Sequence, residues 1–327
     1  YMVFILNCIL IIELVLIIYV MYLLNKNRFI EHFNSVSDNQ KIVNIWNKKE
    51  FTKENINYIN SFATHTRNVK SNTKFNFVIH SIFKNERPFI KEWLDWHLFC
   101  LEGVNHIYLY QNGDDARTRE IIKPYIDRGL VTLVKYNHIR KEGKGLYIKP
   151  QHLCKNHCVD NYGKEYKWIL HIDIDEFLVP TYGDNNINKL FELYGDKDHI
   201  AIKRVNFGSN NYKKHQESVL LSYTKREKKY SSIKSIAKTN NIKDILQKSC
   251  HKWEMNTNNR STCKNKYFQL NHYYTKSLED YLKRDSNSKG TGSRKSTEKD
   301  WIKKNEKIND IDDFVAYNIY KKYVNSK

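Results

Sequence analysis

The chain lacks several features that would place it in a familiar class. Its 327 residues contain no internal repeat and no recognised nucleic-acid-binding motif. Acidic residues are also scarce beside basic ones, with 36 Asp and Glu against 55 Lys and Arg, a net charge of +19. This balance favours acidic partners such as nucleotide phosphates, nucleic acid or an anionic membrane face. It is equally consistent with plain surface composition, because the chain is rich in Lys, Asn, Ile and Tyr.

The six cysteines do not define a metal site. Cys154 and Cys158 lie four residues apart in an expected helix, but no second Cys or His pair has matching spacing, which disfavours structural zinc. Cys250 and Cys263 flank a polar loop and would form a disulfide only in an oxidising compartment. The content of hydrophobic residues is 40% and that of aromatic residues is 13%, which indicates a well-packed globular protein and argues against global disorder.

One long apolar run stands at the start of the chain. Met2 to Leu24 is interrupted only by Asn7 and Glu13, and its length suits one helical crossing of a bilayer. A cleaved signal peptide would have a shorter apolar core and a small-residue cleavage site. A buried helix of a soluble protein is the alternative. We therefore predict a transmembrane anchor over residues 1–24 of a single-pass protein in an endomembrane or a viral or host membrane.

The orientation of this anchor stays open. Lys26 and Arg28 follow it and no basic residue precedes it, so the positive-inside rule places the following domain in the cytosol. However, the sequence starts at Tyr1, and residues before it would carry deciding charges. Residues 25–74 are polar, with a weakly amphipathic helix expected over 51–62, and are predicted to be a stem or linker.

The next part of the chain, residues 75–283, begins with strands and helices in alternation. Such alternation predicts an α/β domain with a mainly parallel sheet flanked by helices. The strands are expected over Phe75–Phe83, Val104–Gln111, Leu130–Tyr136 and Trp168–Ile172, and the helices over Arg87–Leu101, Thr118–Asp127 and Tyr147–Tyr162.

Polar residues follow three of these strands, at the edge where ligands of such sheets bind. They are the residues 84–86, 112–115 and 173–176. Asp173 and Asp175 should share a face, because side chains two apart in a strand point the same way. Two adjacent carboxylates repel one another unless a cation joins them, so we expect Mn²⁺ or Mg²⁺ bridging to phosphate oxygens. Solvated turn carboxylates are the plainer alternative.

The second half of the domain should contain shorter, mixed or antiparallel strands that complete an acceptor-binding face. They are expected over His199–Phe207, Val219–Thr224, Ser232–Lys238 and Lys266–Tyr273, before a helix from Leu278 capped by Ser277. Residues 284–327 are predicted to be a basic loop, mobile over 285–299, and a C-terminal amphipathic helix over 312–323.

Five blocks of this sequence, in this order, resemble glycosyltransferase family 92 and related family 2-like enzymes. The blocks are His80-Ser-Ile-Phe-Lys-Asn-Glu86, Glu92-Trp-Leu-Asp-Trp-His97, Gly103-Val-Asn-His-Ile-Tyr-Leu-Tyr110, His171-Ile-Asp-Ile-Asp-Glu-Phe-Leu178 and Asn271-His-Tyr-Tyr-Thr-Lys-Ser277. The resemblance covers roughly residues 75–283. It implies a GT-A (Rossmann-like) fold and the metal-dependent transfer of a sugar from a nucleotide-sugar donor, with inversion at the anomeric carbon.

The same resemblance implies a metal site and a nucleotide site. Asp173 and Asp175 match the Asp-x-Asp motif that binds metal and diphosphate, and His272 matches a histidine that completes the metal sphere. A histidine bonded to the sheet backbone is the alternative for His272, although imidazole also ligates Mn²⁺. Four residues match positions that contact the nucleotide, either at the uridine or guanosine or at the phosphates. They are Asn85, Glu86, Asn112 and Asp173. The expected cofactor and donor are thus Mn²⁺ or Mg²⁺ and a UDP- or GDP-sugar.

A general base should remove the proton of the acceptor hydroxyl. Glu254 and Glu217 lie in the acceptor half and are the predicted catalytic residues, with Asp244 as a third option. Trp253, next to Glu254, either stacks on a sugar ring or belongs to the core.

Two other functions compete with a membrane-anchored glycosyltransferase that acts on a glycan or glycoprotein. A basic nucleic-acid-binding or phosphoryl-transfer protein would use the same carboxylates and a metal. We expect no nucleic acid partner, because no such motif is present and a membrane anchor would have no purpose there. A catalytically inactive scaffold of the same fold would lack the acceptor base.

Overall fold

The computed structural model describes residues 41, 44–45, 52–70, 73–136, 150–245, 247, 249–288 and 297–327. The chain divides into two compact units, residues 1–55 with 139–141, and residues 56–138 with 142–327. Nearly all described residues belong to the second unit. The predicted anchor over residues 1–24 lies outside the described residues. Within the described ranges, no helix combines the length and the apolar character that a bilayer crossing requires.

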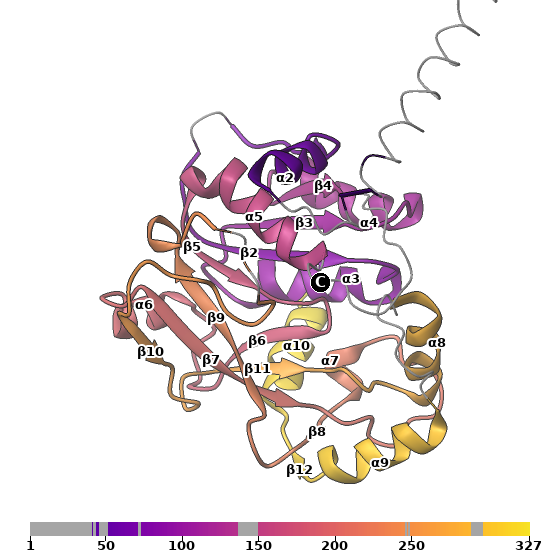
Figure 1. The fold of residues 1–327 in the computed structure, drawn as a ribbon. Coiled ribbons are helices and arrows are strands. Elements are labelled where there is room, and N and C mark those ends of the chain that lie inside the picture. Colours follow the sequence, from indigo (N-terminus) through magenta and orange to yellow (C-terminus); the bar gives the residue numbers. More distant parts are fainter. Residues whose placement is uncertain are drawn as a thin grey trace, which may run out of the picture. The chain divides into compact units, whose positions relative to one another are not determined.

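A ten-stranded mixed sheet forms the centre of the second unit (Figure 1). The strand order is β1-β4-β3-β2-β5-β9-β7-β11-β6, and β10 pairs with β7. Strands β4, β3, β2 and β5 run parallel, whereas β9 is antiparallel to both β5 and β7. The strands are β1 (Thr64–Thr66), β2 (Phe75–Phe83), β3 (His106–Gln111), β4 (Val131–Lys135), β5 (Tyr166–His171), β6 (Glu176–Pro180), β7 (His199–Asn206), β9 (Ser232–Lys238), β10 (Arg260–Thr262) and β11 (Phe268–His272). A separate pair joins β8 (Lys225–Arg226) to β12 (Ile311–Asp312).

Helices accompany the sheet along its whole length (Figure 1). They are α2 (Lys53–Asn60), α3 (Arg87–Asp95) with its π-helical extension η1 (Trp96–Cys100), α4 (Ala116–Asp127), α5 (Pro150–Tyr162), η2 (Gly163–Glu165), α6 (Asn188–Tyr194), α7 (Val219–Ser222), η3 (Thr239–Asn241), α8 (Leu278–Ser288), α9 (Glu298–Ile308) and α10 (Val315–Asn325). Helix α10 packs against α7 and η1, and α8 packs against α9. The parallel strands and their helices confirm the predicted α/β class.

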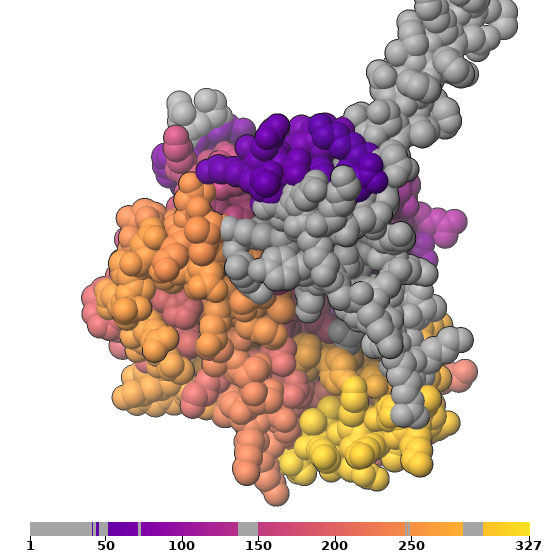
Figure 2. All heavy atoms as spheres, viewed as in Figure 1, coloured from indigo at the N-terminus to yellow at the C-terminus, as the bar shows by residue number. Residues whose placement is uncertain are grey.

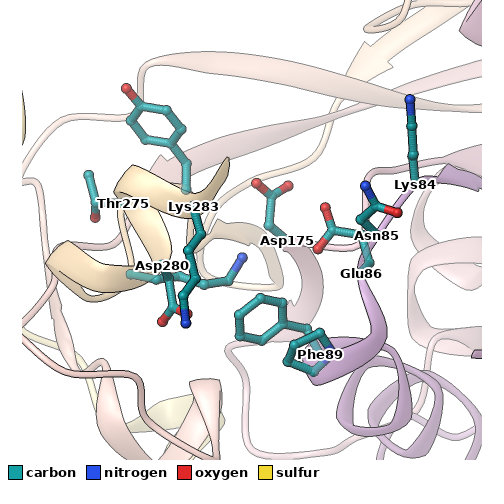
Figure 3. Close-up of a pocket in the computed structure, with 11 residues that line it drawn as sticks. Lys84, Asn85, Glu86, Phe89, Asp175, Thr275, Asp280 and Lys283 are labelled. Carbon is teal, nitrogen blue, oxygen red and sulfur yellow. The ribbon is translucent and has the colours of Figure 1, made fainter. Parts of the chain in front are cut away.

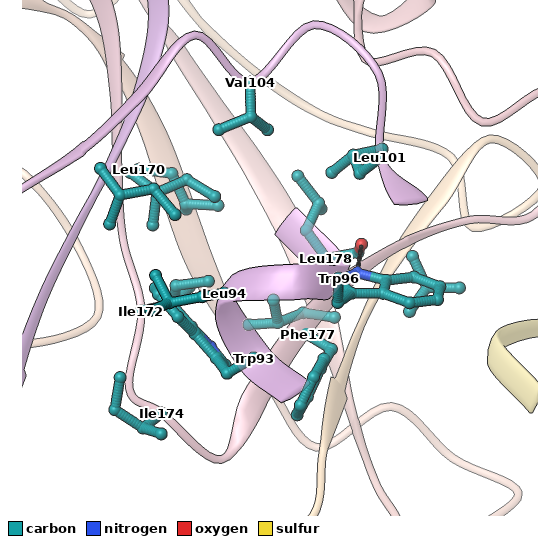
Figure 4. Packing of buried hydrophobic residues seen from close by; sticks show 14 of the residues in the cluster. Trp93, Leu94, Trp96, Leu101, Val104, Leu170, Ile172, Ile174, Phe177 and Leu178 are labelled. Atoms are coloured by element: carbon teal, nitrogen blue, oxygen red, sulfur yellow. Dashed lines mark hydrogen bonds between the residues drawn. The ribbon is translucent and has the colours of Figure 1, made fainter. Parts of the chain in front are cut away.

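The block Glu92-Trp-Leu-Asp-Trp-His97 holds strand β6 in place. The indole nitrogen of Trp93 donates to the Glu176 carbonyl at 2.9 Å, and that of Trp96 donates to the Leu178 carbonyl at 3.0 Å. Leu178 in turn donates its backbone N–H to His97 Nε2 at 3.3 Å. Both tryptophans are fully buried in the main core (Figure 4). Because buried backbone groups need partners, these three side chains fix the position of β6 relative to α3.

One predicted strand is wrong. The segment Val219–Thr224 is rich in residues that favour strands, yet Val219–Ser222 forms the short helix α7. The carboxylate of Glu92 accepts the backbone N–H groups of Val219 at 2.7 Å and Leu220 at 3.0 Å. A carboxylate at the N-terminus of a helix accepts the free N–H groups of the first turn and interacts favourably with the helix dipole. This tertiary contact outweighs the preference of the local sequence for a strand.

Both segments predicted to flank the domain contribute secondary structure to it. Within the predicted stem, β1 pairs with β4, and Arg67 binds Glu165 through two hydrogen bonds of 2.9 and 2.8 Å. Helix α8 continues to Ser288 and α9 starts at Glu298, so both ends of the loop predicted over residues 285–299 are helical. The intervening residues 289–296 lie outside the described part.

Candidate functional site

The acidic motif forms a turn between β5 and β6. Strand β5 ends at His171, and the backbone N–H of Glu176 donates to the Asp173 carbonyl at 3.0 Å. Asp173 and Asp175 therefore do not extend the strand as expected. The bend still places both carboxylates at the edge of the sheet where β2 ends, because β5 lies next to β2 in the parallel part of the sheet.

Asp173 belongs to an ionic cluster with the buried residues Glu176 and Lys234. The Lys234 ammonium lies 3.0 Å from Asp173 Oδ2 and 3.0 Å from Glu176 Oε2, and Arg204 contacts the other oxygen of Glu176 at 3.2 Å. The side chains of Lys234 and Glu176 are completely buried, whereas that of Asp173 is 31% exposed. A buried ammonium between two carboxylates fixes the shape of the turn that carries Asp175.

The charges of this cluster follow from burial and pairing. Burial alone would favour a neutral amine, but Asp173 and Glu176 outweigh it and raise the pKa of Lys234. Burial would also raise the pKa of Glu176, yet Lys234 and His272 outweigh it and lower that pKa. For Asp173 burial prevails over Lys234 and raises the pKa. The cluster thus keeps Lys234 as a cation and Glu176 as an anion.

Asp175 faces His272 across a short gap. His272 Nε2 lies 3.6 Å from Asp175 Oδ2, and His272 Nδ1 lies 2.8 Å from Asn206 Oδ1. Because an amide oxygen only accepts, His272 Nδ1 is the donor in the bond to Asn206, and Nε2 is the ring atom that faces Asp175. A hydrogen bond at 3.6 Å is too long, whereas two cis ligands of an octahedral Mn²⁺ or Mg²⁺ lie about 3 Å apart. The pair therefore suits a divalent cation.

A pocket opens beside Asp175, between the loop after β2 and the segment that joins β11 to α8 (Figure 3). It brings Asp175 together with Asn85 and Glu86, two of the residues predicted to contact a nucleotide. Asn85 has a left-handed backbone (φ 58°), which a non-glycine residue adopts at a cost and often at functional sites. The lining residues are Lys84, Asn85, Glu86, Pro88, Phe89, Asp175, Tyr274, Thr275, Lys276, Asp280 and Lys283.

Lys276 brings a buried positive charge to this pocket. The residue is only 7% exposed, and its ammonium lies 4.1 Å from the centre of the Phe89 ring. Among the described residues its ammonium has no carboxylate within ion-pair distance, although its charge acts on the nearby carboxylate of Glu92. Its backbone is also left-handed (φ 48°), and its carbonyl accepts the Trp301 indole N–H at 3.2 Å. A cation held in a pocket without an ion-pair partner suits an anionic ligand.

The remaining predicted site residues lie elsewhere. Asn112 follows β3 and donates its backbone N–H to the Phe83 carbonyl at 2.9 Å, close to the end of β2, but it does not line this pocket. Glu217 is exposed and Glu254 is half-buried, and neither lines the pocket, so their assignment as bases stays a prediction. Trp253 is 4% exposed and lies beneath the Lys155 ammonium. Of the two predicted roles for this residue, the structure therefore supports a place in the core.

The cysteines of the described ranges are free thiols. Cys154, Cys158, Cys250 and Cys263 are among them, and burial raises the pKa of Cys158 to about 12. Throughout those ranges, no three Cys, His, Asp or Glu side chains converge into a metal-binding group. The assignment of Asp173, Asp175 and His272 as metal ligands stays a prediction, and of these three the structure brings Asp175 and His272 within 3.6 Å of one another.

Comparison with known proteins identifies the family of this chain. The model of glycosyltransferase family 92 matches residues 81–325. This range contains all five sequence blocks described above except His80, the first residue of the first block. A glycosyltransferase family 92 protein of Ricinus communis is 24% identical over 193 residues, 56% of this chain and 32% of that protein. Galactan beta-1,4-galactosyltransferase GALS2 of Arabidopsis thaliana is 29% identical over 126 residues, 37% of this chain and 24% of that protein. The chain thus spans a third or less of the length of these relatives.

Among solved structures, S. aureus TarS 1-349 in complex with UDP aligns with 60% of each chain at 16% identity and a TM-score of 0.37. The family model, by contrast, covers most of the sequence, including the turn with Asp173 and Asp175 and the segment with His272 and Lys276. The chain therefore belongs to glycosyltransferase family 92.

Proposed function

We propose that this protein is a metal-dependent, inverting glycosyltransferase with a GT-A fold that uses a UDP- or GDP-sugar as donor. The acceptor would be a glycan or a glycoprotein. The observation that carries the proposal is the pocket in which Asp175, paired with His272, lies together with the buried cation Lys276. A carboxylate–imidazole pair for a divalent cation, beside an ammonium without an ion pair among the described residues, suits a nucleoside diphosphate group.

Each group of residues has a distinct part in this proposal. Asp175 and His272 would hold Mn²⁺ or Mg²⁺, which when bound supplies positive charge to the departing diphosphate. Lys276 would add a second charge, which its contact with the Phe89 ring already positions. Asn85 and Glu86 would contact the nucleoside at the end of β2. Asp173 would act through Lys234 and Glu176, which hold the turn in shape.

Inversion follows from a single displacement. The acceptor oxygen would bond to the anomeric carbon as the bond from that carbon to the diphosphate breaks. The relative named a galactan beta-1,4-galactosyltransferase forms a β linkage by its name, and a β product from an α-linked nucleotide sugar requires inversion. We therefore infer the same outcome for this chain, with galactose as the first donor sugar to test.

We also propose that residues 1–24 anchor the protein in a membrane. Met2 to Leu24 has the length of one bilayer crossing, and residues 25–51 would link it to the folded domain. The membrane would be an endomembrane or a viral or host membrane. Protease protection of the full chain in sealed microsomes would report the side on which the domain lies.

The first experiment measures donor binding and donor-dependent transfer by the full chain in detergent. UDP- and GDP-sugars, with UDP-galactose first, are compared with Mn²⁺, with Mg²⁺ and with EDTA. We expect one donor to bind and react in the presence of the metal, and the double variant Asp175→Asn with His272→Gln to lose both. Metal-independent binding, or no binding of any donor by folded protein, would refute the proposed site. Metal-dependent binding without transfer or hydrolysis would instead indicate an inactive scaffold.

A further inference from the structure

The pocket contains a carboxylate that was not among the catalytic bases predicted from the sequence. Asp280, in the first turn of α8, lines the pocket together with Asp175, and the two residues come from different elements (Figure 3). We propose that Asp280 is the general base that accepts the proton of the acceptor hydroxyl, and that His215 positions it. This assignment rests on the proposed glycosyltransferase function.

The Asp280 carboxylate is held at both oxygens. His215 Nδ1 lies 2.8 Å from Oδ1, and the Ser277 hydroxyl donates to Oδ2 at 2.7 Å. The side chain is only 10% exposed, so it has few alternative orientations. Since an oxygen of a carboxylate accepts more than one hydrogen bond, each can still receive a substrate proton. A catalytic base needs this kind of fixed orientation before the substrate arrives.

His215 is itself fixed from two sides. Its backbone N–H donates to Glu279 Oε2 at 3.1 Å, and its ring packs against the Phe89 ring with centroids 5.7 Å apart. Phe89 is another lining residue of the pocket. The imidazole thus ties the loop before α7 to helix α8, which lies 65 positions later in the chain, and it turns an N–H toward Asp280 Oδ1. Hydrogen-bonded pairs of an imidazole and a carboxylate are common among catalytic groups, in which one partner fixes the orientation of the other.

A capping box accounts for only one of the two oxygens of Asp280. In a capping box, the acid at the third helical position accepts the backbone N–H of the N-cap residue. Helix α9 has this arrangement, because Asp300 accepts the backbone N–H of Thr297 at 3.2 Å. In α8 the Ser277 N–H donates to Tyr223 OH at 3.0 Å instead. The carboxylate of Asp280 therefore keeps only the bond from the Ser277 hydroxyl to Oδ2, and its other oxygen faces His215.

The other carboxylates of the pocket have different surroundings. Asp175 faces His272, and Glu86 lies beside Asn85 on the loop proposed to hold the nucleoside. Asp280 comes from a different wall, on the element that also carries Lys283. In the proposed step the acceptor O–H bond breaks and its proton passes to Asp280. The acceptor oxygen bonds to the anomeric carbon, and the electron pair of the broken carbon–oxygen bond leaves with the diphosphate.

The test uses the full chain and the donor identified in the first experiment. We expect Asp280→Asn to lower kcat at least about 100-fold, the usual share of a general base, while the Kd of the donor changes less than about threefold. Asp300→Asn is the matched control, because it removes an acid from the same helical position of α9. It should lower the thermal midpoint and leave kcat within about threefold of the wild type.

Two further variants separate catalysis from folding. Asp280→Glu keeps a carboxylate and should retain more activity than Asp280→Asn at equal thermal stability. His215→Asn keeps an N–H donor near the position of Nδ1 and should retain most of kcat, whereas His215→Ala should lose about tenfold with an unchanged KM for the donor. Activity of Asp280→Asn within threefold of the wild type would overturn the assignment while leaving the proposed function intact. Failure of the wild type to transfer any sugar would instead refute the proposed function.

Discussion

His272 and Asp175 point their side chains at one another at a distance that excludes a hydrogen bond, with 3.6 Å between Nε2 and Oδ2. The two residues come from distant parts of the chain, from strand β11 and from the turn before β6, and these strands pair antiparallel with His272 opposite Glu176. That register is what brings a histidine 97 positions away to the acidic turn. The pairing of β11 with β6 is therefore a structural requirement of the proposed metal site.

Removing either proposed ligand should weaken the metal rather than the fold. For Asp175→Asn and for His272→Gln, we expect the Mn²⁺ concentration that gives half-maximal donor binding to rise by about 10-fold to 100-fold or more. Asn206→Ala should give a smaller increase, because it removes only the partner that orients the ring. Isothermal titration calorimetry with Mn²⁺ and the donor nucleotide measures the Mn²⁺ affinity of each variant. Equal Mn²⁺ affinity in all three variants and the wild type would contradict it.

Lys276 should contribute to the binding of the diphosphate through its charge alone. The variant Lys276→Met has a side chain of similar length that can still pack on Phe89, but it lacks the ammonium. We expect the Kd for UDP or GDP to rise about 10-fold to 100-fold, whereas the Kd for the uncharged nucleoside stays within about threefold. Competition binding with the nucleoside and its mono- and diphosphates provides the measurement. An equal loss for nucleoside and diphosphate would show that Lys276 acts through packing.

Local sequence was sufficient for much of this fold. Strand β2 has the predicted bounds Phe75–Phe83, and the helix capped by Ser277 starts at Leu278 as expected, because hydrophobic pattern and capping are local signals. The helix α7 was missed because Glu92, more than 120 residues earlier in the chain, provides its N-terminal acceptor. The helix α9 was also missed, although Thr297 and Asp300 form a capping box within four residues, a local signal that was overlooked.

The site was predictable only in part for the same reason. Asn85, Glu86 and Asp175 follow parallel strands or belong to the motif turn, and they meet at one pocket as the position of strand ends implies. Lys234 and Lys276 were missed, because in a chain with 55 basic residues nothing local distinguishes a buried lysine from a solvated one. Asp280 was missed because its partner His215 lies on a different segment.

The buried cation Lys234 should be essential to the stability of the acidic turn. Lys234→Met leaves Asp173 and Glu176 without their shared cation, and breaking a buried pair in this way costs about 3–5 kcal/mol of unfolding free energy. Lys123→Met, which breaks an exposed pair with Asp127, should cost less than about 1 kcal/mol. Urea denaturation at pH 7 measures both. A cost below about 1 kcal/mol for Lys234→Met would show that the cluster is well solvated.

Acid should destabilise the protein through histidines that are buried as neutral rings. Burial lowers the pKa of His97 to about 3, and it lowers the pKa of His106 and of His157 to about 4. A histidine in the unfolded chain has a pKa near 6.5, so the unfolded state binds more protons as the pH falls from about 6.5 toward 4. The free energy of unfolding should therefore fall over this range, by up to about 1.4 kcal/mol per pH unit for each such ring.

His97 offers a direct test of this dependence. In His97→Gln the amide oxygen can still accept the Leu178 N–H, but no group titrates there. We expect the slope of unfolding free energy against pH between 6 and 4.5 to decrease by about 1.4 kcal/mol per pH unit. Trp96→Phe is the control, because it removes the donor to the Leu178 carbonyl without removing a titrating group, so it should lower stability equally at each pH. Urea denaturation at pH 7, 6, 5 and 4.5 measures all three proteins, and an unchanged slope in His97→Gln would show that His97 takes up its proton in the folded state.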